Sequence, residues 1–223
     1  MKTTFINGWL RAICIMLFLT IMGCQEKRQE IRNQETKKAS PTFKTVMKAP
    51  DDNFAKAQEA FSHQAYKTSA EDIRLTIPYL RDLASVSDEK GQNVIERTVT
   101  SLEDLAHNVE TGHVKSSEKL DVYLGFVCAN LVHSEIVAAE NVLKPGDRLQ
   151  AGNLLDNSLK HFNEASEYVA IPANDQRFVQ DLEALDKVIK QDTTTTLDQY
   201  HEKFVQLKKD LQTAQDQMRK AAS

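Results

Sequence analysis

Apolar side chains recur at helical spacing from Asn53 to the end of the chain. The clearest run lies near the C-terminus and alternates steps of three and four residues: Leu197, Tyr200, Phe204, Leu207, Leu211, Ala214, Met218 and Ala221. Such steps place the side chains on one helix face, as in an antiparallel bundle or coiled coil. A shorter seam precedes it across a threonine-rich link at 191–196: Phe178, Leu182, Leu185 and Ile189. The short link predicts antiparallel neighbours.

The segment from Ser116 to Leu143 predicts one long helix, ended by Pro145-Gly146. Its apolar residues form two stripes: Leu120, Leu124, Val127, Leu131 and Ala138, and Val122, Phe126, Ala129, Ile136 and Leu143. A helix that is apolar on two sides packs against several neighbours. We therefore expect this helix to be the central one of the domain.

Further amphipathic helices are predicted at 68–86, 88–109 and 147–171. Pro78 lies inside the first of them, and because proline lacks an amide hydrogen we expect a kink there. The chain has seven glycines and five prolines, and strong helix formers dominate the rest. These patterns predict an all-α domain at 53–223, an antiparallel up-and-down bundle of five to six helices.

A shift of 82 residues superimposes apolar positions of the first predicted helices on those of later ones. Phe54, Ala57 and Phe61 fall on Ile136, Ala139 and Leu143, and Ile73, Ile77 and Leu80 fall on Leu155, Leu159 and Phe162. Two duplicated helical hairpins packed side by side would give this pattern. Amphipathic helices also align by chance, so the sequence leaves the duplication open.

Residues 1–24 have the layout of a secretion signal. Lys2 and Arg11 are basic, and an apolar core of about 11 residues follows, which is shorter than the roughly 20 residues of a membrane-spanning helix. The core ends in Ile21-Met22-Gly23-Cys24. Two alternatives are an uncleaved membrane anchor and an ordinary signal peptide, which typically has small residues at both −3 and −1. Ile21 does not fit the latter.

The run Ile21-Met22-Gly23-Cys24 resembles the lipobox of bacterial lipoproteins. The resemblance implies cleavage of the signal peptide 1–23 after Gly23 and fatty acylation, of the palmitate kind, at Cys24. The next residue is Gln25 rather than Asp. In a Gram-negative envelope this implies an outer-membrane lipoprotein facing the periplasm, and in a Gram-positive host the outer face of the plasma membrane.

Residues 24–52 carry the lipidated Cys24 and then a polar, charge-mixed stretch without apolar periodicity, which predicts a flexible tether. As a coil it would hold the domain roughly 30 Å from the bilayer. Without residues 1–23 the chain has 26 Lys and Arg against 32 Asp and Glu, which argues against nucleic-acid binding. Of the cysteines, Cys128 alone remains in the domain, so we expect no intrachain disulfide and a buried thiol.

The candidate site residues are His133, Glu140 and His161. His133 shares a stripe with Phe126, Glu140 lies about two turns further on, and His161 lies on the next predicted helix. In a hairpin turning at Pro145-Gly146, the two histidines would differ by about 6 Å in height. The three could hold a metal ion. The alternative is that each histidine is satisfied by hydrogen bonds within the fold.

Motifs of known catalytic chemistry are missing from the sequence. There is no paired Cys or His zinc pattern, no Cys-x-x-Cys-His, no glycine-rich phosphate loop, no Gly-x-Ser-x-Gly and no His-Glu-x-x-His. We therefore expect no catalytic residues, no cofactor and no enzymatic activity.

One stretch of the domain resembles a family of envelope proteins. His133–Leu143, then Gly146-Asp147, then Ala151–Leu155 is similar to the helical pairs of YfdX-type proteins. The resemblance implies a secreted, all-helical envelope protein with a role in stress response, and it carries over no functional residue. We expect a membrane-anchored lipoprotein with a non-catalytic binding domain and an unidentified protein partner. The alternative is a bundle that binds a metal or small ligand.

Overall fold

The computed structural model describes residues 51–169, 176–192 and 194–221. All of them belong to one compact unit, residues 43–223. The described residues are helical or form the turns between helices, and no β-strand occurs among them, so the all-α prediction is confirmed. The predictions for the signal peptide 1–23, for Cys24 and for the tether up to residue 50 lie outside the described residues.

Eight helices follow one another in this part of the chain: α2 (Asp51–Ser62), α3 (Tyr66–Arg74), α4 (Ile77–Ser85), α5 (Glu89–Glu110), α6 (Ser117–Leu143), α7 (Arg148–Tyr168), α8 (Gln176–Gln191) and α9 (Leu197–Ala221). The count of five to six is therefore not confirmed. One reason is that the helix predicted at 68–86 is two helices, α3 and α4. Pro78 lies in the first turn of α4, where a missing amide hydrogen costs no helical hydrogen bond. The expected kink is instead a helix boundary.

The helix ends follow from local sequence. Asp88, Ser116 and Asp147 each precede a helix, and each side chain accepts a hydrogen bond from the backbone N–H three residues on. These N-caps satisfy amides that have no partner within the helix. Gly112 and Gly146 follow α5 and α6 with φ of +70° and +96°, a left-handed conformation that glycine adopts without strain. The turns they make fold α5, α6 and α7 back on one another.

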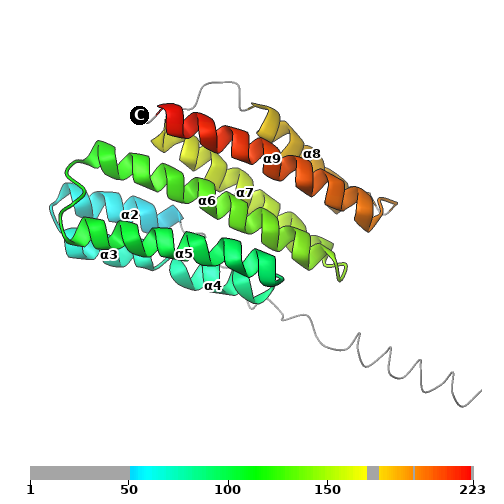
Figure 1. Ribbon diagram of the computed structural model, residues 1–223, viewed down its shortest axis with the longest axis horizontal. Coiled ribbons are helices and arrows are strands. Elements are labelled where there is room, and N and C mark those ends of the chain that lie inside the picture. The colour runs from blue at the N-terminus through cyan, green and yellow to red at the C-terminus, as the bar shows by residue number, and fades with distance from the viewer. Residues whose placement is uncertain (1–50, 170–175, 193, 222–223) are drawn as a thin grey trace, which may run out of the picture. The chain divides into compact units, whose positions relative to one another are not determined.

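Helix α6 is the central element, as its two apolar stripes predict. It contacts α2, α4, α5, α7 and α9, and Figure 1 shows it between α5 and α9. By length and composition alone α6 could also cross a membrane, but 72% of its most apolar 18-residue window is buried inside the bundle. That burial is typical of the core helix of a globular domain.

Helix α9 packs its heptad seam into the domain. The side chains from Tyr200 to Met218 on this seam are at most 2% exposed, whereas Leu197 at its start is 55% exposed. The seam of α8 is equally buried. The two helices are in contact and run antiparallel, as predicted (Figure 1).

Candidate functional site

A buried cluster of polar side chains lies where α4, α6 and α7 meet. Glu135 of α6 is 0% exposed. Its carboxylate accepts a hydrogen bond from the hydroxyl of Tyr79 on α4. His161 of α7, also fully buried, places Nδ1 2.9 Å from Oε1 and 3.0 Å from Oε2 of the same carboxylate. Asn157 donates from Nδ2 to the Tyr79 hydroxyl at 3.3 Å. The cluster therefore ties three helices together through one carboxylate.

Burial decides what this cluster can do. A buried carboxylate must keep hydrogen-bond donors, since it has lost its water. Burial, and then the charge of Glu135, raise the pKa of the Tyr79 hydroxyl well above its usual range, so Tyr79 stays protonated and remains a donor. General acid–base chemistry needs a substrate within hydrogen-bond reach. A carboxylate enclosed by its own partners is suited to fixing the helices instead.

The same α6–α7 interface holds two further titratable groups, Glu164 one turn after His161 and Cys128 two turns before Glu135. Glu164 is half-buried, and desolvation raises its pKa, although the neighbouring His161 opposes that shift. Cys128 is fully buried, and its pKa is raised well above its usual range by burial and then by Glu164 and Glu135. A reactive thiol requires a lowered pKa and access. The thiol of Cys128 is therefore protonated and inert.

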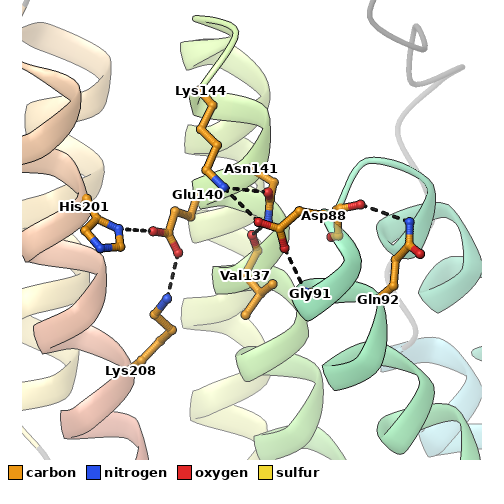
Figure 2. Close-up of polar contacts among 10 residues, drawn as sticks. Asp88, Gly91, Gln92, Val137, Glu140, Asn141, Lys144, His201 and Lys208 are labelled. Carbon is orange, nitrogen blue, oxygen red and sulfur yellow. Dashed lines mark hydrogen bonds and ion pairs between the residues drawn. The ribbon is translucent and has the colours of Figure 1, made fainter.

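The three residues singled out from the sequence have different neighbours. His161 belongs to the buried cluster, where its carboxylate partner is Glu135. Glu140 reaches towards α9, with Oε1 2.6 Å from Nδ1 of His201 and Oε2 2.7 Å from Nζ of Lys208 (Figure 2). His133 is half-buried on α6. Within the described ranges, no group of three or more His, Cys, Asp or Glu side chains is placed to hold a metal ion.

Glu135 and Tyr79 were not singled out from the sequence, although a signal for Glu135 exists. One stripe of α6 steps by three or four residues to Leu131 and then by seven to Ala138. Position 135 fills that gap, so the stripe itself predicts that its carboxylate is buried. Tyr79 offers no comparable signal, because it follows Pro78 in a segment that the pattern treats as one continuous helix.

His133 makes the stability of the domain depend on pH. Its pKa lies below the ordinary value of 6.5, because burial and then the charges of Lys208 and Arg97 disfavour the imidazolium. As pH falls below about 6.5 the unfolded chain takes up a proton that the folded protein does not. The stability that the neutral imidazole of His133 contributes is therefore complete above that pH and is lost on acidification.

Between about pH 7 and about pH 5 the free energy of unfolding of the wild type should fall, and we expect it to fall less in His133→Gln. Urea denaturation at the two pH values measures this loss. The same substitution at His107, an exposed histidine of α5, is the matched control. An unchanged pH dependence in His133→Gln would show that other groups cause it.

A surface pocket lies between the end of α6 and the first turns of α9, and we call it the α6–α9 pocket. Its volume is about 230 Å³, and it is lined by Glu140, Leu143, Lys144, Leu197, Asp198, Tyr200, His201 and Phe204. Figure 2 shows the α6 side of this region, with Lys144 directed towards α5 and Glu140 towards α9. Lys144 donates to Asp88 and to Asn141, each at 3.0 Å. The pocket therefore combines an apolar floor with a charged rim.

A second pocket, of about 190 Å³, lies at the other end of the contact between α6 and α9. It is lined by Phe126, Ala129, Asn130, Gln215 and Arg219. Gln215 donates to the backbone carbonyl of Ala129 at 3.0 Å, and Arg219 pairs with Asp216. The α6–α9 pocket is the larger of the two and has a carboxylate and an imidazole, Glu140 and His201, in its lining, so it is the stronger candidate binding site.

No protein-family model, curated protein or solved structure matches this chain. The resemblances to lipoproteins and to YfdX-type proteins therefore stay predictions, and the function must be argued from the residues themselves. Two features bear on it. Neither pocket is lined by a member of the Tyr79–Glu135–His161 cluster, whereas Glu140 and His201 line the α6–α9 pocket.

Proposed function

We propose that the protein is a membrane-anchored envelope lipoprotein whose helical domain is a non-catalytic binding module. The lipobox-like run ending at Cys24 supports the anchor, and Gln25 supports an outer-membrane location facing the periplasm. The bilayer is then one partner, through the acylated Cys24, and a protein or ligand bound by the domain is the other. A role in stress response rests on the YfdX-type resemblance alone.

One observation carries the assignment of a binding module. The fully buried Glu135 is held by Tyr79 and His161, whereas Glu140, Lys144, Asp198 and His201 border an apolar pocket at the surface. A site of this composition can bind, because the apolar floor supplies contact area and the polar rim supplies orientation. Tyr79, Glu135 and His161 are themselves buried where a substrate cannot reach them.

We also infer that the bundle is built from two duplicated halves that share α6. Under the shift of 82 residues, α2 corresponds to the end of α6, α3 and α4 to α7, α5 to α8, and α6 to α9. The neighbours correspond as well: α2 contacts α3 as α6 contacts α7, and α5 contacts α6 as α8 contacts α9. Residues 54, 57 and 61 and their counterparts 136, 139 and 143 are all buried. These parallels support a duplicated up-and-down arrangement.

The anchor is tested by Cys24→Ala. We expect this variant to lose incorporation of a radiolabelled fatty acid, to keep its signal peptide and to leave the outer-membrane fraction. The reason is that the thioether of Cys24 is the attachment point on which the later steps depend. Pulse labelling followed by membrane fractionation measures all three properties. Labelling that persists in Cys24→Ala would refute the lipoprotein assignment.

The metal-binding alternative is tested on the purified wild-type protein. For a module without a metal we expect no stoichiometric metal by elemental analysis and an unchanged melting temperature on addition of zinc. A rise of several degrees that is lost in both His133→Ala and His161→Ala would replace the proposal with a metal-binding bundle.

A further inference from the structure

We propose that the α6–α9 pocket binds an organic ammonium ion with an apolar body, an aryl-alkyl ammonium of small size. The inference rests on the proposed function of the domain as a binding module and names the chemistry of its ligand. Glu140 is the charged group that would receive the ammonium, and the apolar floor would receive the ring.

The carboxylate of Glu140 is held asymmetrically. Its side chain is 12% exposed, and Lys208, which binds Oε2 at 2.7 Å, is 27% exposed. His201, which binds Oε1 at 2.6 Å, is 65% exposed. The imidazole therefore lies mostly in solvent and is attached at one point. An ammonium group can take the place of His201 on Oε1, while Lys208 stays on Oε2 and keeps the carboxylate in position.

The floor of the pocket has the size and character that an aromatic ring requires. Leu143, Tyr200 and Phe204 are at most 3% exposed in the domain, and Leu197 stands 55% exposed at the rim. An enclosed cavity of about 150 Å³ lined by Leu, Ile and Phe side chains holds benzene, whereas the α6–α9 pocket is open to solvent. The α6–α9 pocket, at about 230 Å³, has room for a phenyl ring and a two-carbon ammonium arm.

The charge around the pocket favours a cation over an anion. Lys144, a basic group at the rim, is paired with Asp88 of α5 at 3.0 Å, and Glu140 is paired with Lys208 at 2.7 Å, so these two ion pairs leave no excess charge of either sign. Asp198 adds a second carboxylate to the lining. Residues 51–223 together carry 29 Asp and Glu against 19 Lys and Arg, and an acidic surface raises the local concentration of cations.

The test uses the mature lipidated protein in phospholipid nanodiscs and 2-phenylethylammonium as the probe, with empty nanodiscs as the blank for partitioning into lipid. Isothermal titration calorimetry gives the dissociation constant. We expect saturable binding to one site. The neutral 2-phenylethanol should bind about tenfold more weakly, because it forgoes a charge-assisted hydrogen bond, and the anionic 3-phenylpropionate should not bind.

Three variants locate the site. Glu140→Gln should weaken binding by about tenfold or more, and Glu202→Gln, an equal charge change at an exposed position of α9, should not. His201→Ala should bind the ammonium more tightly than the wild type, since it removes the competitor for Oε1. A purely structural role of Glu140 would not produce that gain.

The inference is overturned if the wild-type protein does not bind the ammonium, if the alcohol or the carboxylate binds equally well, or if Glu140→Gln binds unchanged. Should Glu140→Gln fail to fold, the comparison of ammonium with alcohol in the wild type decides. If the ammonium does not bind, the ligand class is wrong. The lipid anchor, tested by fatty-acid labelling of Cys24, and the binding of a protein partner are tested independently, so the ligand class and the proposed function can fail separately.

Discussion

Replacement of His161 by leucine is expected to lower the free energy of unfolding by about 3–5 kcal/mol. The imidazole is the partner of a carboxylate that has no exposure of its own. Its removal leaves the Glu135 carboxylate with the Tyr79 hydroxyl and without its imidazole partner. A buried charge that loses its partner is among the most destabilising changes in a protein core. Equilibrium unfolding in urea, followed by circular dichroism, measures the change.

Two further variants separate the charge effect from a general loss of packing. Tyr79→Phe removes one donor from the carboxylate and should cost about 1–3 kcal/mol. The double variant Glu135→Met with His161→Leu removes both the carboxylate and the imidazole and should recover most of the stability lost in His161→Leu alone. If the double variant is less stable than the single one, the cost comes from packing around position 161 and the argument from buried charge is wrong.

The second large effect is expected in α9. Leu207 is 1% exposed, whereas Val205, two residues earlier on the same helix, is 50% exposed. Leu207→Ala should therefore lower the free energy of unfolding by about 2–5 kcal/mol, since it leaves a cavity in the core. Val205→Ala is the matched control and should change it by about 0.5 kcal/mol or less. Thermal and urea unfolding measure both.

Light scattering of the same two variants tests the competing interpretation of the heptad seam. A seam of alternating three- and four-residue steps also suits pairing with a second chain. If Leu207→Ala converts a dimer to a monomer without lowering the stability of the monomer, then the seam pairs between chains and its burial within the domain is not what stabilises α9.

The long, strongly periodic helices could be predicted from the sequence, because apolar residues every three or four positions leave one way to bury them. Helices α5, α6 and α9 follow from that pattern. The boundary between α3 and α4 does not, since the apolar pattern continues across it. Pro78 marks the place, but proline is compatible both with a kink and with a first helical turn. Tertiary packing decides between the two.

The candidate site was less predictable, for a geometric reason. Glu135 and Glu140 lie five residues apart on α6, which separates them by about 140° around the helix axis. One therefore faces α7 and the other faces α9. The sequence shows both acids within the same apolar helix. It does not show which neighbour each side meets, because that depends on how five other helices are arranged around α6.

The central place of α6 bears on how the domain folds. Helices α2, α4 and α5 precede it in the chain and α7 and α9 follow it, yet all five pack against it. The helices made first therefore have no complete core until residue 143 has arrived, and the most apolar segment stays uncovered until the later helices dock. Such half-assembled species aggregate most readily. Neither the helices before α6 nor those after it form a complete core without it, so this connectivity favours assembly of both sides around α6 together.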